Sequence, residues 1–318
     1  MVRRKLTEVL EEYRQKKKRL RWNTIDSYSR AWNKLIDFTG DIMVSDFDNA
    51  EDFEAYLFEQ ALAAGAVKSN MKMVKVIMRW AWQKDYRQGD PFSGLRLPRV
   101  PGKEIRVFTD AELYGMLAAA PNDMWAARII AAGSAGLRRS ESLNLKVSDV
   151  DFDKGIIKIQ SCKDTKETWP YSPKDYESRR LPLTEELNRL FVRILDELPV
   201  GYPYLMITAK RYWWLQQLRS QGKMGPRMMI NPDENFCKPF GKILRTAKIR
   251  DGTYRDLRST AITRWLLAGL APQEAQRLAG HSDIETTMTF YAACRADIID
   301  RARQAWSIGA TGLEPATS

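Results

Sequence analysis

The chain has 318 residues, enough for two domains of ordinary size, and hydrophobic residues make up 44% of it. Its 51 Lys and Arg residues outnumber 40 Asp and Glu residues, which leaves a formal net charge of +11. Such a surplus favours a polyanionic partner, because phosphates neutralised by a protein release their condensed counterions. A single histidine and three cysteines without a CxxC spacing argue against a zinc site built on paired histidines and against a disulfide framework.

The N-terminus and the pattern of hydropathy predict a cytoplasmic protein. Residues 1–5 lead into a charged helical stretch without the apolar core of a signal peptide. No uncharged run reaches the length of a membrane span. The widely spaced Cys162, Cys237 and Cys294 suit a reducing compartment. We therefore expect no membrane contact.

Residues 1–95 are predicted to form a helical domain. Apolar residues recur at helical spacing after a cap at Asn23 or Thr24, then in a second helix that ends near Gly65, and in a third over about 68–85. Three basic residues share one face of the third helix: Lys72, Lys75 and Arg79. That face is either a contact for a DNA backbone or an ordinary solvated face, and segments further along the chain favour DNA.

Prolines and a glycine interrupt the helical pattern over residues 96–107, which indicates an extended linker. A second domain is expected over 108–308, and it opens with a capping box from Thr109 to Glu112. After a helix over about 124–132, two β-type segments at 155–159 and 180–183 precede mostly helical residues. Residues 309–318 are expected to be a disordered tail. The predicted fold class is therefore mainly α with a small β-sheet, a helical domain followed by a mixed α+β domain.

Three separated segments of the second domain carry the candidate chemistry. The first holds Arg138, the second Arg255 and Arg258, and the third His281 and Tyr291. Each is weak alone, since a helical arginine usually makes a surface salt bridge. In this order and over this span, they resemble the catalytic domain of the tyrosine recombinase (phage integrase) family. The resemblance covers roughly residues 105–306, and the helical first domain resembles the core-binding domain of that family.

The resemblance implies that the protein cuts and rejoins double-stranded DNA without a metal ion, another cofactor or a small-molecule substrate. Tyr291 would attack phosphorus and form a 3′-phosphotyrosyl link, which stores the bond energy so that no ATP is needed. Arg138 and Arg258 match the two arginines of the family, whose guanidiniums can fork onto one phosphodiester. His281 matches the position that hydrogen-bonds the scissile phosphate. Tyr254, the competing tyrosine, is expected to pack rather than to attack.

The sequence departs from the family pattern in two places. The family takes the proton for the leaving 5′-oxygen from a lysine on a β-hairpin, for which we choose Lys163, with Lys166 as the alternative. Residues 164–178 make this hairpin longer than is usual in the family. Arg255 stands where the family usually has a histidine. Because arginine stays protonated, Arg255 can hold phosphate but cannot take the proton of the tyrosine.

Three functions fit these observations. The first is site-specific recombination, for integration or excision, by a homo-tetramer on DNA. The tetramer is implied by the resemblance alone, and residues 297–308 would dock on a neighbouring subunit or pack on their own domain. The second is a recombinase-derived DNA-binding protein with weak or no strand exchange. The third is a type IB topoisomerase, against which the compact first domain argues. The joint presence of four matching residues favours recombination: Arg138, Arg258, His281 and Tyr291.

Overall fold

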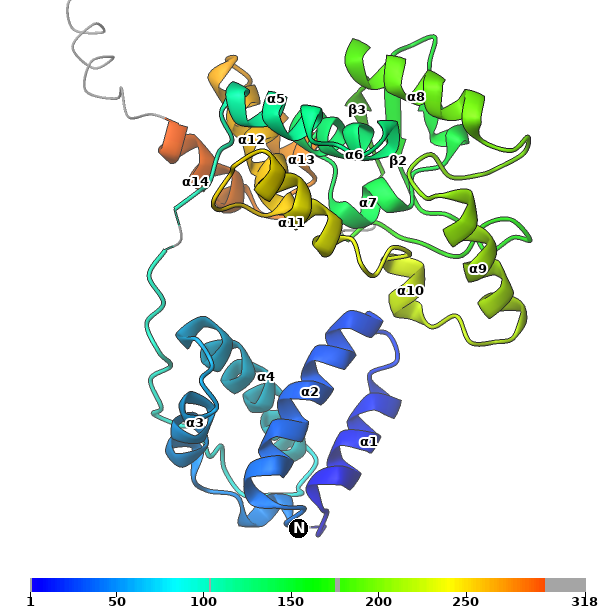
Figure 1. The fold of residues 1–318 in the computed structure, drawn as a ribbon. Helices are drawn as coiled ribbons and strands as arrows, with labels where there is room; N and C mark the ends of the chain where they lie inside the picture. Colours follow the sequence, from blue (N-terminus) through cyan, green and yellow to red (C-terminus); the bar gives the residue numbers. More distant parts are fainter. Residues whose placement is uncertain (1, 103, 175–177, 295–318) are drawn as a thin grey trace, which may run out of the picture. The chain divides into compact units, whose positions relative to one another are not determined.

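The computed structural model describes residues 2–102, 104–174 and 178–294 (Figure 1). The chain divides into two compact units, Met1–Lys103 and Glu104–Ser318, and the boundary falls within the linker predicted over 96–107. The tail expected at 309–318 and the docking segment at 297–308 lie outside the described residues. Within the described ranges, no helix combines the length and the apolar character needed to cross a membrane.

The first unit is built from helices around one apolar core. They are α1 (Leu6–Lys16), α2 (Trp22–Thr39), α3 (Ala50–Glu59) and α4 (Ala64–Gln83), with a 3-10 turn at Val44–Asp46. Trp32 of α2 is fully buried, and its indole Nε1 donates to the Leu6 carbonyl at 2.8 Å, which ties α2 to α1. The amphipathic pattern of the sequence thus yields a closed helical unit.

Two helix ends in this unit differ from the prediction. α2 begins at Trp22, so its cap is Arg21 rather than Asn23 or Thr24. α3 ends at Glu59, because Ala61 takes a left-handed conformation with φ 55° that cannot continue a helix. Gly65, predicted as the end of the second helix, lies inside α4 instead.

The second unit holds the remaining elements. Its helices are α5 (Asp110–Ala118), α6 (Asp123–Gly133), α7 (Arg139–Leu143), α8 (Glu185–Glu197), α9 (Ala209–Ser220), α10 (Pro226–Ile230), α11 (Cys237–Thr246), α12 (Tyr254–Leu267), α13 (Pro272–Ala279) and α14 (Ile284–Cys294). The capping box predicted at the first of them is present: the Thr109 side chain accepts from the Glu112 backbone N–H at 3.2 Å, and the Glu112 carboxylate accepts from the Thr109 backbone N–H at 2.9 Å.

An antiparallel sheet in the order β1-β2-β3 accompanies these helices. Its strands are β1 (Val150–Asp151), β2 (Ile156–Ile159) and β3 (Arg179–Pro182), and a 3-10 turn at Val147–Asp149 precedes β1. Ile157 lies opposite Val150 and Leu181, and the three pack in one core with side chains of α6 and α8. The pairing of Ile159 with Arg179 places the arginine where the two strands open into the long hairpin.

Part of that long hairpin is a packed element. Beyond β2, Cys162 and Tyr171 pair through two backbone hydrogen bonds of 2.8 and 3.1 Å, and together they close a turn over residues 163–170. Trp169 in this turn is fully buried and stacks on Tyr204, with ring centroids 4.5 Å apart. Its indole donates to Asn144 Oδ1 at 2.9 Å. The turn is therefore held by the packing of Trp169 against residues outside the hairpin.

Candidate active site

Three arginines converge on the C-terminal end of α13. The carbonyl oxygens of three consecutive residues accept hydrogen bonds from one guanidinium each: Leu278 from Arg179, Ala279 from Arg258, and Gly280 from Arg138. The last carbonyls of a helix lack partners within it and carry partial negative charge, so cations are favoured there. Gly280 ends the helix in a left-handed conformation with φ 64°. The first two predicted segments thus meet at the third.

Glu141 is the buried carboxylate at the centre of this cluster. Its oxygens accept from Arg179 at 2.9 and 2.6 Å, and from Arg138 Nη1 at 2.9 Å. Burial alone would raise the pKa of Glu141, but the hydrogen bonds and charge of Arg179, with the nearby Arg138 and Arg258, lower the pKa to about 2. The carboxylate stays ionised and holds Arg138 in place.

Arg258 is buried, with 7% of its surface exposed, and links two backbone segments. Its Nη1 donates to the Gly136 carbonyl at 2.6 Å. Burial lowers the pKa of Arg258 to about 9, and the positive charge of Arg138 acts in the same direction. Gly136 has φ 65°, and a Cβ added there would lie 2.7 Å from the ring of Trp265, so only glycine presents this carbonyl without strain. Arg258 remains a cation at neutral pH.

A cavity of about 590 Å³ lies beside these arginines. Four of the six predicted catalytic residues are in its lining: Arg138, Arg255, Arg258 and His281. Arg255 is exposed, whereas Arg258 beside it in the lining is buried. A hollow bordered by several guanidiniums and a histidine matches the charge and the forked geometry of a phosphodiester.

His281 follows directly on the C-terminal end of α13. Its Nδ1 lies 2.9 Å from the hydroxyl of Thr287, which is fully buried on α14, and its ring stacks on Phe290 at 6.0 Å between centroids. The Thr287 hydroxyl can donate to Nδ1, an arrangement that puts the imidazole proton on Nε2. α14 begins with the backbone N–H of Glu285 donating to Asp283 Oδ1 at 2.9 Å.

Tyr291 lies on α14 and is half-buried. It packs against an apolar cluster of α12 and α13: Ile262, Leu266, Ala275 and Ala279. Among the described residues, the lining of the cavity does not include Tyr291. The carbonyl of Ala279, a member of this cluster, accepts from Arg258. Tyr291 therefore packs against the same helix end whose carbonyls bind the arginines.

Tyr254, the competing tyrosine, is buried between Phe236 and Phe240. Its hydroxyl donates to the Arg128 carbonyl at 2.6 Å and lies 3.3 Å from the Ser142 hydroxyl. Burial raises the pKa of Tyr254 to about 12. A phenol whose proton is held in a hydrogen bond and whose pKa is raised is a poor nucleophile. Tyr254 is therefore a packed core residue, as expected.

The lysines of the hairpin differ in their position relative to the cavity. Lys163 and Lys166, the two predicted proton donors, are exposed in the turn over residues 163–170, outside the described lining of the cavity. Lys174, further along the same hairpin, is in that lining with Arg138 and His281. Of these three lysines, Lys174 is therefore the one in the described lining of the cavity.

The first unit carries a basic groove of about 490 Å³ on α1 and α4. Its lining includes all three basic residues predicted to share a face, together with a fourth cation and two aromatic side chains: Lys72, Lys75, Arg79, Lys17, Tyr13 and Trp80. Asp90 lies 3.7 Å from Lys75 and 4.0 Å from Arg79, and Lys75 donates to the Phe92 carbonyl at 3.1 Å. Lys75 and Arg79 thus both lie near Asp90, and Lys75 is further held by the Phe92 carbonyl, while all three basic residues line the groove.

Comparison with known proteins gives the family. The phage integrase family matches residues 106–296, and the phage integrase SAM-like domain matches residues 5–97. The chain belongs to the phage integrase family. Its mainly helical fold with a small sheet is the predicted one.

Curated relatives of this phage integrase family member include tyrosine recombinases. The tyrosine recombinase XerC-like protein of Caldanaerobacter subterraneus subsp. tengcongensis is 24% identical over 258 residues, which is 74% of this chain and 64% of the relative. Tyrosine recombinase XerA of Pyrococcus furiosus is 27% identical over 198 residues, or 62% of this chain and 60% of the relative. The chain therefore spans less than two thirds of the length of these relatives.

Solved structures show the same fold. The Tn1549 transposon integrase in complex with transposon right end DNA has a TM-score of 0.72 at 19% identity, covering 96% of this chain and all of that one (100%). A lambda integrase dimer bound to a COC′ core site has a TM-score of 0.66 at 12% identity, covering 91% and 77%.

Three residues of the arginine cluster or of the cavity lining were not among the sequence predictions: Glu141, Arg179 and Lys174. Glu141 stands three positions after Arg138, a spacing at which side chains on a helix meet, so the pair was recognisable. Arg179 reaches the site from the sheet, and its partner Leu278 is 99 positions away, so no local pattern signals it. Lys174 shares the hairpin with Lys163 and Lys166, and only the fold distinguishes them.

Proposed function

We propose that the protein is a site-specific DNA recombinase that cuts and rejoins duplex DNA through a 3′-phosphotyrosyl link on Tyr291. The observation that carries the proposal is the cavity at the end of α13, where Arg138, Arg258 and His281 meet. The recombinase names of the curated relatives and the DNA held by the structural neighbours support it.

The arginines would bind the scissile phosphate and stabilise its transition state. Attack on phosphorus adds negative charge to the non-bridging oxygens, and preorganised cations stabilise that charge where water is excluded. Arg258 is fixed by two backbone carbonyls, and Arg138 by Glu141 and Gly280, so both guanidiniums need little reorganisation. Arg255, exposed in the same lining, adds a third positive charge. In this way the chain supplies from arginines the charge that metal ions supply in other nucleases.

His281 would donate from Nε2 to a phosphate oxygen, with Thr287 holding Nδ1. Such a hydrogen bond grows stronger as charge develops on the oxygen, so it favours the transition state over the bound substrate. Arg255 cannot accept the phenol proton, since a guanidinium stays protonated. In this arrangement Nδ1 of His281 already accepts from Thr287 and Nε2 donates to the phosphate, so the proton of Tyr291 leaves through water.

Lys174 would protonate the leaving 5′-oxygen, and Lys174→Ala is expected to slow cleavage roughly 10²–10⁴-fold, the usual contribution of a general acid. DNA with sulfur in place of the bridging 5′-oxygen should restore the rate, because a thiolate leaves without a proton. The measurement is the rate of covalent adduct formation on both substrates.

Lys163→Ala is the matched control, since Lys163 lies in the same hairpin outside the described lining of the cavity. We expect cleavage at close to the wild-type rate on both substrates. The opposite result would be a Lys163 variant that cleaves slowly and is rescued by the sulfur substrate, with a Lys174 variant that cleaves at the wild-type rate. It would identify Lys163, the residue chosen from sequence, as the general acid. A slow rate that sulfur does not restore in either variant would mean that neither lysine is the acid.

The basic groove of the first unit would hold the DNA backbone, and Lys72→Ala with Arg79→Ala should weaken binding to any duplex sequence. Phosphates bound by the protein release counterions, so the slope of log K against log salt should fall by about 0.9 for each phosphate that the variant no longer binds. Fluorescence anisotropy over a salt series measures both quantities. Lys154→Ala, which removes an exposed lysine paired with Asp151, is the control. An unchanged slope in the groove variant would contradict this role.

The decisive experiment is trapping of the covalent intermediate. The exchange site is first selected from a randomised duplex library by binding and cleavage, and a nick is then placed next to the cleaved bond so that the released strand diffuses away. The proposal predicts a protein–DNA adduct that survives denaturant and disappears after protease treatment. Specific binding without any adduct would contradict strand exchange.

A second function, DNA binding without efficient strand exchange, is favoured by Arg255 at the family's histidine position. Arg255→His separates the two: a gain in adduct formation would assign the slow step to the missing proton acceptor.

For the active enzyme we further propose a homo-tetramer on DNA in the cytoplasm. The mass of the protein assembled on its selected site tests the tetramer.

A further inference from the structure

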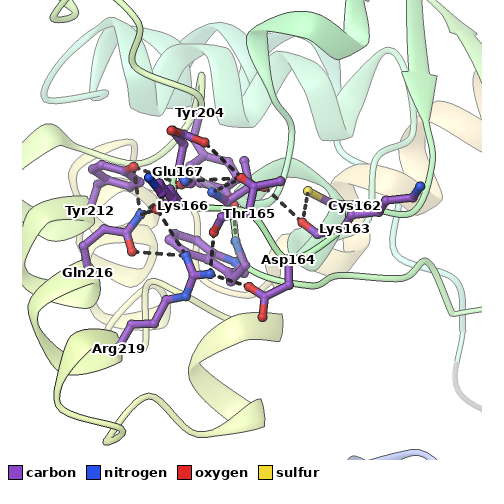
Figure 2. Close-up of polar contacts among 12 residues, drawn as sticks. Cys162, Lys163, Asp164, Thr165, Lys166, Glu167, Tyr204, Tyr212, Gln216 and Arg219 are labelled. Carbon is purple, nitrogen blue, oxygen red and sulfur yellow. Dashed lines mark hydrogen bonds and ion pairs between the residues drawn. The ribbon is translucent and has the colours of Figure 1, made fainter.

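One side of α9 is fixed to the turn over residues 163–170 (Figure 2). Gln216 Nε2 donates to the carbonyls of Lys166 and Glu167, at 3.0 Å each, and Tyr212 donates to the Glu167 carbonyl at 2.9 Å. Arg219 pairs with Asp164 and also donates to backbone oxygens of the turn. These contacts attach one side of α9 to the turn.

The opposite side of α9 is exposed, and we call it the outer face. It consists of residues at i, i+3, i+4 and i+7: Lys210, Trp213, Trp214 and Gln217. Trp213 is 59% exposed and Trp214 41%, whereas Tyr212 and Leu215 on the inner side are buried. Two adjacent exposed tryptophans on an anchored helix form an apolar patch of the kind that marks an interaction site.

The charge around the outer face indicates which partner it binds. Apart from Arg219, which pairs with Asp164 on the inner side, residues 198–232 contain four basic residues and no Asp or Glu: Lys210, Arg211, Lys223 and Arg227. Lys210, Lys223 and Arg227 are exposed, and the Arg211 guanidinium lies 4.1 Å from the ring centroid of Trp214. A second copy that met this face with its own outer face would bring the same basic residues against it, and these would repel. A polyanion with apolar sugar edges matches both the charge and the indoles.

We propose that the outer face of α9 is an additional duplex DNA contact, separate from the catalytic cavity and the basic groove. Lys210 pairs with backbone phosphates, and the indoles of Trp213 and Trp214 pack on deoxyribose edges. This contact reads no bases, because phosphate and sugar contacts set position rather than sequence. The inference rests on the proposed function, since it assumes that the second unit engages duplex DNA.

The test uses the full chain and a fluorescent duplex of random sequence, about 40 bp long, titrated over a salt series. Lys210→Ala should weaken binding and reduce the slope of log K against log salt by about 0.9. Trp213→Ala with Trp214→Ala should raise Kd roughly tenfold and leave the slope unchanged, because no charge is removed. Tyr114→Ala, which removes an aromatic side chain that is 72% exposed on α5, is the matched control and should bind as wild type.

The outcomes separate this inference from the proposed function. If both α9 variants bind like the wild type while Lys72→Ala with Arg79→Ala is weakened, the outer face is not a DNA contact and DNA binding still stands. If the tryptophan variant instead changes the sedimentation of the free protein, the occupant is a second copy and the inference is overturned. A flat salt response of the wild type itself contradicts the proposed function. Lys210→Glu, an exposed charge reversal, repeats the test without removing packed aromatic surface.

Discussion

Tyr291→Phe is expected to abolish the covalent protein–DNA adduct. The substitution removes only the hydroxyl, so the ring keeps its place against the apolar cluster of α12 and α13 and the fold is retained. No other side chain supplies the attacking oxygen in the proposed mechanism, so the adduct should disappear completely rather than in part. Denaturing gels of the nicked substrate after incubation measure the adduct, and anisotropy should show unchanged DNA binding.

Tyr254→Phe is the matched control for this prediction. Its hydroxyl bonds to the Arg128 carbonyl and to Ser142, so the change should lower the free energy of unfolding by about 1 kcal/mol while the adduct still forms. An adduct that persists in Tyr291→Phe and is absent in Tyr254→Phe would exchange the roles of the two tyrosines. An adduct that persists in both would place the nucleophile elsewhere.

The sequence predicted those site residues that local motifs carry. Arg138, Arg258 and His281 each sit in a short segment, and all three line the cavity. What holds them is long-range: the hydrogen bond from Arg138 to the Gly280 carbonyl spans 142 positions, and that from Arg258 to the Gly136 carbonyl spans 122. Backbone carbonyls have no sequence signature, so these hydrogen bonds could be identified only in the three-dimensional structure.

The choice of the hairpin lysine likewise depends on long-range contacts that the sequence does not reveal. Lys163 follows β2 closely and is the natural choice from sequence. The pairing of Cys162 with Tyr171 and the burial of Trp169 against Tyr204 close the first part of the hairpin into a turn of its own. The tryptophan's partners come from outside the hairpin, so their effect cannot be read from the local pattern. Lys174, beyond that turn, lies in the lining of the cavity instead.

Glu141→Gln should destabilise the second unit more than any substitution of an exposed acid. The side chain of Glu141 is fully buried, and its charge offsets Arg138, Arg179 and Arg258. Without that charge, adjacent guanidiniums repel each other in a poorly solvated place, and breaking a buried ion pair usually costs about 3–5 kcal/mol. Urea unfolding measures the change. Asp123→Asn, which breaks the exposed pair with Arg193, should cost at most about 1 kcal/mol.

The effect of Glu141 should also depend on pH in a defined direction. The folded state lowers its pKa from 4.5 to about 2, so its stabilising contribution is fully present above about pH 4.5 and is lost as the pH falls toward 2. The corresponding linkage is about 3 kcal/mol. The difference in unfolding free energy between wild type and Glu141→Gln should therefore narrow over that interval, whereas the Asp123→Asn difference, from an exposed pair, should change far less. A gap that stays constant from neutral pH to about pH 3 would show that Glu141 acts through its shape and hydrogen bonds rather than through its charge.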